Sequence, residues 1–365
     1  MSYQPGRMGM AEGIGLTFIV MLPRVFLTSP ANTIATIRNI AWTAPLLNWV
    51  VALAVFYLLA WVTARHRGDL YAVSERLLGR AGAWLLALFY TALFVFDAAS
   101  LLRQFAENTL LTALPATEFR VVIFWYIFFA AVLVYFGVEG IARASYLLMP
   151  FVIGGVMAVL LLLEPFYDVY HLVPWQGTGL GPALQRGLAL AGINFGGLLL
   201  FVLAPQFQSP ATLRTALVYG GSLSALVRTL VILGYLLAFG VAQGMEKTLP
   251  FFEMSRLVYL SRYVQRIESL FIVIWVITGL LAIAIDLYAA LQLIVRPLKL
   301  PSLRPLIPMV ALIIVNIAVL PPDLSSVVES DNDLGLLFTA GVIGGPLLLA
   351  GAAYIKGRRK RPWSA

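Results

Sequence analysis

The longest stretches of this sequence are apolar and nearly free of charge. Ten such segments, each about 20 residues or longer, cover most of the 365-residue chain, and a helix needs roughly 20 apolar residues to cross a membrane. Only 12% of the residues are charged, against roughly 25% in soluble domains. Because polarity does not alternate as in a membrane barrel, we predict an all-α integral membrane protein with ten transmembrane helices. We expect these helices at residues 10–34, 42–64, 81–112, 119–137, 144–164, 184–207, 211–242, 266–296, 303–322 and 334–356.

Basic residues are divided unequally between the two sides of the predicted membrane. If the N-terminus is cytoplasmic, the inner loops and the tail hold roughly twice as many Lys and Arg residues as the outer loops. Cytoplasmic loops of membrane proteins carry such an excess. We therefore predict a multi-pass protein of the cell membrane with both termini in the cytoplasm. The basic run Lys356–Arg361 directly follows an apolar span, so it indicates contact with membrane lipid rather than with nucleic acid.

The predicted helices divide evenly into two sets of five, at about 10–164 and about 184–356. An odd number of helices in each half inverts the second half relative to the first, which is the arrangement of inverted-repeat transporters. No stretch between the spans is long enough to form a soluble domain. We therefore predict a single transmembrane domain over residues 1–365, built as a five-plus-five inverted repeat.

The first helix of each half contains glycine and proline interruptions. Helix 1 has Gly15 and Pro23, and helix 6 has Gly196 and Gly197 followed by Pro205. Such paired interruptions in corresponding helices indicate a binding site near the bilayer midplane, although small residues also occur where membrane helices pack closely. We predict broken helices 1 and 6: helix 1 breaks between Gly15 and Pro23, and Gly196 and Gly197 lie where helix 6 is non-helical and faces helix 1.

Polar side chains lie inside two of the predicted spans. Asp97, Ser100 and Gln104 are spaced by three and four residues in helix 3, so they share one helix face that must look into the bundle. Helix 8 similarly aligns Thr278 with Asp286. Ionisable groups within a membrane cost several kcal/mol unless they are paired or solvated. Two interpretations stay open for the two acids: an ion or proton relay, or contacts that hold the helices together.

Sequence motifs for catalysis are missing. The chain contains no cysteine and two histidines, which fall in loops on opposite sides of the membrane. It also has no phosphate-binding Gly-x4-Gly-Lys, no His-Glu-x-x-His and no Gly-x-Ser-x-Gly. We therefore expect no enzyme activity, no catalytic residue, no metal site and no cofactor.

Two local motifs and the overall size resemble one known family. Helix 1 closes with Ile19-Val-Met-Leu-Pro-Arg24, and an amphipathic stretch at about 253–262, predicted to lie on the outer membrane face, precedes Arg266-Ile-Glu-Ser269 and Trp275. These features resemble the spore germination permease family, the integral-membrane B subunits of nutrient germinant receptors, within the amino acid–polyamine–organocation transporter superfamily. The family usually has a glycine just before the Leu-Pro of helix 1, which this chain lacks.

The resemblance implies a place in the spore inner membrane and a larger A subunit and a lipoprotein C subunit as partners. It also implies a small nutrient ligand, often an amino acid, bound between helices 1, 3, 6 and 8, which would trigger germination. An ordinary secondary amino acid permease, coupled to a proton or a sodium ion, is the alternative, since fold does not decide function.

The expected site combines the helix interruptions with the polar faces. Freed backbone amides beside Gly15 and Gly196 can hold a carboxylate, aided by the half-helix dipoles. Asp97 and Asp286 are the candidates for an ion or proton relay. The expected ligand-binding residues are Gly15, Thr17, Met21, Pro23, Asp97, Ser100, Asn194, Phe195, Gly196, Gly197 and Thr278.

Overall fold

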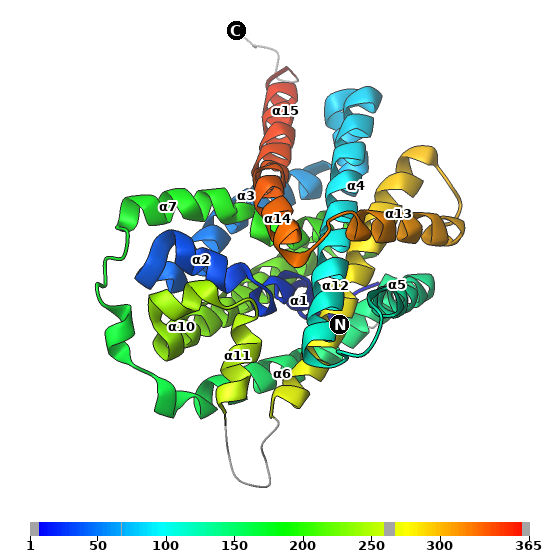
Figure 1. The fold of residues 1–365 in the computed structure, drawn as a ribbon. Helices are drawn as coiled ribbons and strands as arrows, with labels where there is room; N and C mark the ends of the chain where they lie inside the picture. The colour runs from blue at the N-terminus through cyan, green and yellow to red at the C-terminus, as the bar shows by residue number, and fades with distance from the viewer. Residues whose placement is uncertain (1–6, 67, 259–266, 360–365) are drawn as a thin grey trace.

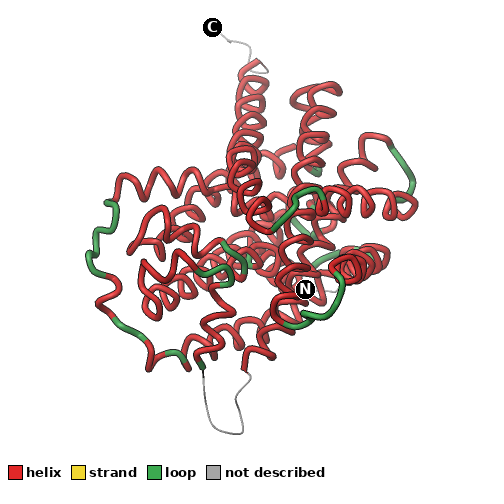
Figure 2. Tube along the Cα trace, viewed as in Figure 1, coloured by secondary structure: helices red, strands yellow, loops and turns green. Residues whose placement is uncertain are grey.

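The computed structural model describes residues 7–66, 68–258 and 267–359. Throughout these residues the secondary structure is helical, and the only extended pairing in them is an isolated bridge between Met8 and Phe207 (Figure 2). Eight helices among them are long and apolar enough to cross a membrane. These are Ser29–His66, Leu70–Thr112, Phe119–Phe136, Val138–Leu162, Gly181–Val202, Pro210–Glu246, Phe271–Leu298 and Asp333–Lys356.

The prediction of an all-helical, multi-pass membrane protein is therefore confirmed. Two of the ten predicted spans are not among these eight helices. The segment 10–34 is divided by an interruption, and the segment 303–322 is a shorter apolar helix, Arg304–Val319.

The first half of the chain contains five predicted spans, of which only the first is divided. Its elements are α1 (Met10–Met21), η1 (Pro23–Phe26), α2 (Ser29–Ile37), η2 (Arg38–Thr43), α3 (Ala44–His66), α4 (Leu70–Thr112), α5 (Phe119–Phe136) and α6 (Val138–Leu162). Asp69 caps α4 by accepting a hydrogen bond from the amide of Ala72 at 2.8 Å. Gly137 joins α5 to α6 with a φ of 96°, a conformation that glycine adopts without steric cost.

The second half is more irregular. It comprises η3 (Glu164–Phe166), η4 (Val169–Leu172), α7 (Leu180–Ala189), η5 (Leu190–Leu198), α8 (Leu199–Val202), η6 (Ala204–Gln206), α9 (Pro210–Thr215), η7 (Ala216–Gly220), α10 (Gly221–Glu246), α11 (Pro250–Leu257), α12 (Ile267–Leu298), η8 (Arg304–Leu306), α13 (Ile307–Val319), α14 (Leu324–Thr339), η9 (Ala340–Gly344) and α15 (Gly345–Arg359). The amphipathic helix expected at 253–262 corresponds in part to α11. The helix ends at Leu257, and residues 259–262 and Arg266 lie outside the described residues.

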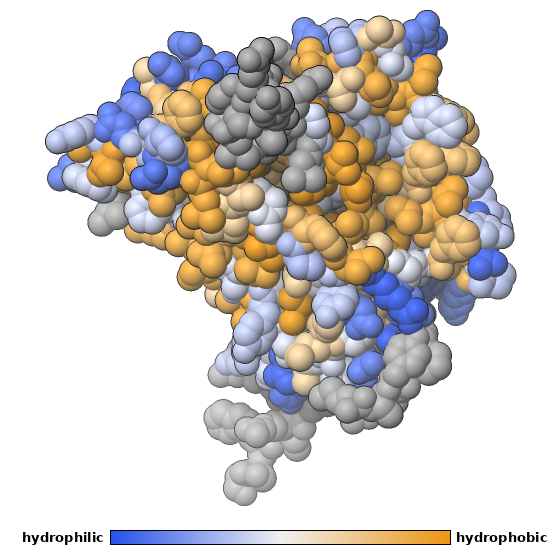
Figure 3. Space-filling view, turned by 90° about the horizontal axis from the view of Figure 1, so that it is seen from below, coloured by the Kyte–Doolittle hydropathy of each residue, from blue (hydrophilic) through white to orange (hydrophobic). Residues whose placement is uncertain are grey.

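Helix α1 occupies the middle of the bundle. It packs against α6, α12, η5 and η7, while α4 and α12 lie side by side along most of their length (Figure 1). Large apolar side chains remain exposed on outward faces, for example Phe124, Trp125 and Phe136 on α5. Orange residues accordingly cover much of the surface seen in Figure 3, with blue residues towards its margins. Such an apolar surface is suited to lipid, not to water.

Of the two predicted helix interruptions, the one in helix 1 is confirmed, and the prediction that Gly196 and Gly197 are non-helical is wrong. The break in helix 1 between Gly15 and Pro23 is confirmed, because α-helical structure ends at Met21 and a 3₁₀ turn begins at Pro23. In helix 6 the α-helix ends at Ala189, and Gly196 and Gly197 lie in the 3₁₀ segment η5. The helix is thus tightened there rather than unwound.

Candidate functional site

Proline begins the interruption of helix 1. Pro23 has no backbone N–H and therefore cannot continue the α-helical ladder. The amides of Val25 and Leu27 instead donate to the carbonyls of Leu22 and Arg24, at 3.0 and 3.3 Å. This tighter winding places Arg24 at the point where α1 and α2 separate.

Arg24 meets two carboxyl groups from other helices. Its guanidinium forms an ion pair with Asp97 of α4, and Asp286 of α12 lies beside Asp97 and near Arg24. Asp97 is 6% exposed and Asp286 only 1%. One cation facing two acids leaves one negative charge uncompensated when all three groups are ionised. In a membrane interior such a charge is costly unless a proton, a cation or a ligand neutralises it.

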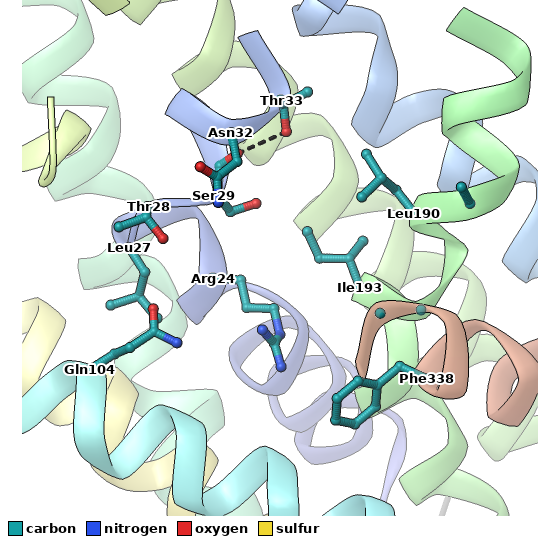
Figure 4. A pocket seen from close by; sticks show the side chains of 13 residues that line it. Arg24, Leu27, Thr28, Ser29, Asn32, Thr33, Gln104, Leu190, Ile193 and Phe338 are labelled. Carbon is teal, nitrogen blue, oxygen red and sulfur yellow. Dashed lines mark hydrogen bonds between the residues drawn. The ribbon is translucent and has the colours of Figure 1, made fainter. Parts of the chain in front are cut away.

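A small cavity opens directly on Arg24. Its volume is about 100 Å³, which is room for several water molecules at about 10–15 Å³ each. Arg24 lies between Gln104 and Phe338, and its guanidinium points away from Ser29, Asn32 and Thr33 (Figure 4). The guanidinium carbon lies 5.7 Å from the centre of the Phe338 ring. The cavity is lined by Arg24, Leu27, Thr28, Ser29, Asn32, Thr33, Gln104, Ala189, Leu190, Gly192, Ile193, Gly335 and Phe338.

A buried polar network supports helix 6 behind this cavity. Asn194 departs from helical geometry, with φ −91° and ψ 15°. Its side chain donates to Asn48 of α3 at 3.0 Å and accepts a hydrogen bond from Arg228 of α10 at 2.7 Å. Arg228 is 2% exposed, and its Nε and Nη1 have no hydrogen-bond partner among the described residues. The network therefore joins three helices around the irregular point of η5.

The predicted ligand-binding residues lie around the cavity rather than on its wall. Asp97 does not line the cavity but forms an ion pair with Arg24, which does. Ser100 accepts a hydrogen bond from Gln104 at 2.9 Å, and Phe195 packs edge-on to Phe338.

The other predicted residues make packing or local contacts. A Cβ atom at Gly15 would lie 2.5 Å from the Cα atom of Tyr146, and one at Gly197 would lie 2.5 Å from the ring of Phe56. Gly196 lies against Val20 of α1 in the same way, which agrees with its expected orientation. The hydroxyl groups of Thr17 and Thr278 bond to backbone carbonyls of their own helices, and Met21 and Pro23 are buried.

None of the thirteen residues that line the cavity was among those predicted to bind the ligand. Arg24 carried a usable signal, because it is a charged residue within a span directly after the proline that breaks the helix. Gln104 carried another, as a member of the polar face of helix 3. Gly335 and Phe338 come from the last predicted span, where the sequence has no pattern that points to a site.

Comparison with known proteins agrees with the helical architecture. The chain resembles the spore germination protein KB of Bacillus subtilis (strain 168), with 24% identity over 68% of each chain. It also resembles the spore germination protein A2 of the same organism, with 22% identity over 92% of this chain and 93% of the relative.

Two solved transporters share the fold. A Na⁺-coupled sialic acid symporter in its substrate-bound, outward-open state superimposes with a TM-score of 0.66 at 14% identity, over 98% of this chain and 91% of the symporter. A manganese transporter of Eremococcus coleocola gives 0.65 at 13% identity, over 95% and 77%.

The family model for spore germination proteins matches residues 9–327. The family match and the transporter fold indicate a non-enzymatic membrane protein. It belongs to the spore germination permease family.

Proposed function

We propose that this protein is the integral-membrane subunit of a spore nutrient germinant receptor, and that a small nutrient such as an amino acid binds in the cavity at Arg24 and triggers germination. The observation that carries this proposal is the double position of Arg24. Arg24 lines the cavity, and its guanidinium forms the ion pair with Asp97. A ligand that enters the cavity therefore meets Arg24, whose positive charge is already paired with the carboxylate of Asp97.

The chemistry of the cavity favours a small zwitterion. Guanidinium groups bind carboxylates through two parallel hydrogen bonds, so Arg24 suits the carboxylate of an amino acid. Oxygen atoms of Ser29, Asn32 and Gln104 lie within the same lining and can accept hydrogen bonds from an ammonium group. The small volume excludes large side chains.

Ligand binding would change the ion pair and not simply add to it. When the carboxylate of the ligand bonds to Arg24, it competes with Asp97 for the same guanidinium. The released Asp97 carboxylate, beside Asp286, can then take up a proton or a cation, which is the relay that we propose for these two acids. Because Arg24 lies at the break of helix 1, this exchange would move α1 relative to α2.

The remaining features of the proposal concern architecture and partners. We place ten transmembrane helices in a five-plus-five inverted repeat, with repeats at about 10–164 and 184–356 within one domain. The two interrupted helices, each the first of its half, support this assignment. We place the protein in the spore inner membrane with both termini cytoplasmic, in contact with lipid and with an A subunit and a lipoprotein C subunit.

A secondary amino acid permease is the second candidate. The observation that favours it is the Asp97–Asp286 pair inside a fold shared with a Na⁺-coupled symporter. Buried acids of this kind are the usual proton or ion carriers of transporters. A permease would use the same cavity and the same exchange at Arg24.

Binding of radiolabelled small amino acids to the purified protein tests the shared site. Gly335 lines the cavity, and an added Cβ there meets no atom within 4 Å, so Gly335→Leu fills the cavity without displacing a neighbour. Gly344, which also has open space around it but lies outside the cavity, provides the control Gly344→Leu. We expect Gly335→Leu to abolish binding and Gly344→Leu to retain it. Equal binding by both variants would place the ligand elsewhere.

Uptake measurements then separate the two functions. In proteoliposomes with an imposed proton or sodium gradient, a permease accumulates the bound amino acid, and a pure receptor subunit binds it without accumulation. Germination of spores that carry the Gly335→Leu variant supplies the third measurement. A normal dose response in those spores would contradict a sensing role for this cavity.

A further inference from the structure

A second, larger cavity lies where α5, α12 and α13 end or begin. Its volume is about 650 Å³. It is formed by the last residues of α5, the last three turns of α12 and the connection that leads to α13. None of its lining residues is shared with the cavity at Arg24. Because these are the ends of apolar helices, the cavity lies at the level of a membrane surface.

The local sequence fixes the shape of this cavity. Pro297 lies in the last turn of α12 and removes one backbone donor there, and Pro301 follows the helix. Lys299 turns the chain with a φ of 53°. The amides of Lys299 and Leu300 donate back to carbonyls of the last turn of α12, at 3.2 and 3.1 Å. The turn therefore holds the basic side chains on both of its sides near one another.

Positive charge dominates the wall of the cavity. Arg296, Lys299 and Arg304 all line it, and none of the described residues that line it is acidic. Arg296 is paired with Asp69 at 2.9 Å. Among the described residues no carboxylate pairs with Lys299 or Arg304, and the guanidinium carbon of Arg304 lies 4.6 Å from the ring centre of Tyr135. Two cations are thus available to an anion.

Apolar surface adjoins these cations. Phe136 is 75% exposed and Leu300 is 38% exposed, and both line the cavity together with the polar side chains of Gln292 and Ser302. A ligand that fits both surfaces has an anionic head and a hydrocarbon portion. Basic pockets between transmembrane helices at a membrane surface are known to bind anionic lipid headgroups.

We propose that this cavity binds the phosphate of an anionic phospholipid, with Lys299 and Arg304 as the phosphate ligands and Phe136 and Leu300 against the acyl chains. Free phosphate offers the same anionic group as the lipid headgroup. Only the lipid also has hydrocarbon chains that contact Phe136 and Leu300. This site is independent of whether the protein senses or transports a nutrient.

Bound lipid would be connected to the core through one tyrosine. Tyr288 lines the cavity and accepts hydrogen bonds from Gln292 at 2.8 Å and from Gln206 at 3.0 Å. The backbone carbonyl of Gln206 in turn accepts a hydrogen bond from the amide of Met8 at 2.7 Å. A headgroup in the cavity therefore stabilises packing between α12 and the segment that precedes α1, and thermal stability of the whole protein is a suitable measure of binding.

The test titrates the delipidated full-length protein with phosphatidylglycerol, with phosphatidylcholine of the same acyl chains, and with inorganic phosphate alone. We expect phosphatidylglycerol to raise the thermal unfolding midpoint saturably, and to remain bound in native mass spectra, while the other two have little effect. A response to phosphatidylcholine equal to that for phosphatidylglycerol would overturn the recognition of an anionic head. A full response to inorganic phosphate would overturn the assignment to lipid.

Charge variants locate the site. Lys299→Gln with Arg304→Gln should weaken phosphatidylglycerol binding at least tenfold. Arg143→Gln is the matched control, because Arg143 is a half-exposed basic residue paired with Glu139 and does not line the cavity. If the double variant binds phosphatidylglycerol as tightly as the control does, the proposed site is wrong. A tenfold loss in the double variant alone supports it.

Discussion

The break in helix 1 presents a charged side chain to a cavity, whereas the interruption of helix 6 contributes only uncharged residues to the wall of that cavity. Arg24 at the first break is partly exposed and has an acidic partner. Arg228, which supports the second, is fully buried and bonds to the neutral Asn194. The difference indicates that the two helices have separate roles. Helix 1 supplies the charge to which a ligand can bind, and helix 6 supplies a rigid part of the cavity wall.

The largest effect should follow the removal of the cation at the first break. Arg24→Gln leaves Asp97 and Asp286 buried without their neighbouring cation. Loss of one partner of a buried ion pair lowers the free energy of unfolding by about 3–5 kcal/mol. We expect the thermal unfolding midpoint of the purified protein to fall strongly. The double variant Arg24→Gln with Asp97→Asn should recover part of the loss, because one of the two acids is then neutral. An unchanged midpoint in Arg24→Gln would mean that the ion pair is not important for the fold.

The second break should be almost as sensitive, although Asn194 itself does not line the cavity. Asn194→Leu removes the hydrogen bonds to Asn48 and Arg228, and together these are worth about 2–4 kcal/mol, since hydrogen bonds to charged groups are the stronger ones. The control is Asn316→Leu, at an exposed position of α13 where the amide only bonds to the carbonyl of Leu312. Thermal unfolding should separate the two variants clearly. Equal midpoints would contradict a supporting role for the Asn194 network.

A smaller effect should distinguish packed glycines from open ones. At Gly196 a Cβ atom would lie 2.5 Å from the Cγ1 atom and 3.3 Å from the carbonyl oxygen of Val20, and overpacking of this kind costs about 1–3 kcal/mol. At Gly335 nothing lies within 4 Å, and alanine is favoured over glycine inside a helix by roughly 0.5–1 kcal/mol. Gly196→Ala should therefore lower the unfolding midpoint and Gly335→Ala should raise it slightly. If both variants shift the unfolding midpoint in the same direction, the two glycines do not differ in the way their surroundings are packed.

The sequence predicted the features that depend on local chemistry. Apolar length identified the membrane helices, and the missing N–H of Pro23 located the break in helix 1. The spacing of Asp97, Ser100 and Gln104 placed a polar face towards the bundle interior, where Asp97 is 6% exposed. Each of these follows from a short segment alone, because backbone hydrogen bonding and helix periodicity are local properties.

The wall of the cavity could not be predicted in the same way. The glycines of helix 6 were predicted to contact a ligand. A Cβ atom at Gly197 would instead clash with the ring of Phe56 and one at Gly196 with Val20, whereas Gly335 on α14 lines the cavity and has open space around it. Which glycine faces empty space depends on side chains that come from other helices. The alignment of Arg228 with Asn194 and Asn48 is likewise a product of packing, since these residues are far apart in the chain.

The smallest effect on stability, and the most informative for function, is expected from Asp97→Asn. The amide oxygen can still accept a hydrogen bond from Arg24, and Asp286 remains nearby to balance its charge, so the loss should be about 1 kcal/mol. Ligand behaviour should change more. If the carboxylate of the ligand and Asp97 compete for Arg24, neutralising Asp97 removes the competitor, and binding of the amino acid should become about tenfold tighter, or 1.4 kcal/mol. Germination should nevertheless require more nutrient, because the exchange that releases Asp97 no longer occurs. Equilibrium binding and spore dose response, measured on the same variant, check both halves of this expectation. Weaker binding would show that Asp97 contacts the ligand directly, and a variant that fails to accumulate in the membrane would show that the acid serves the fold.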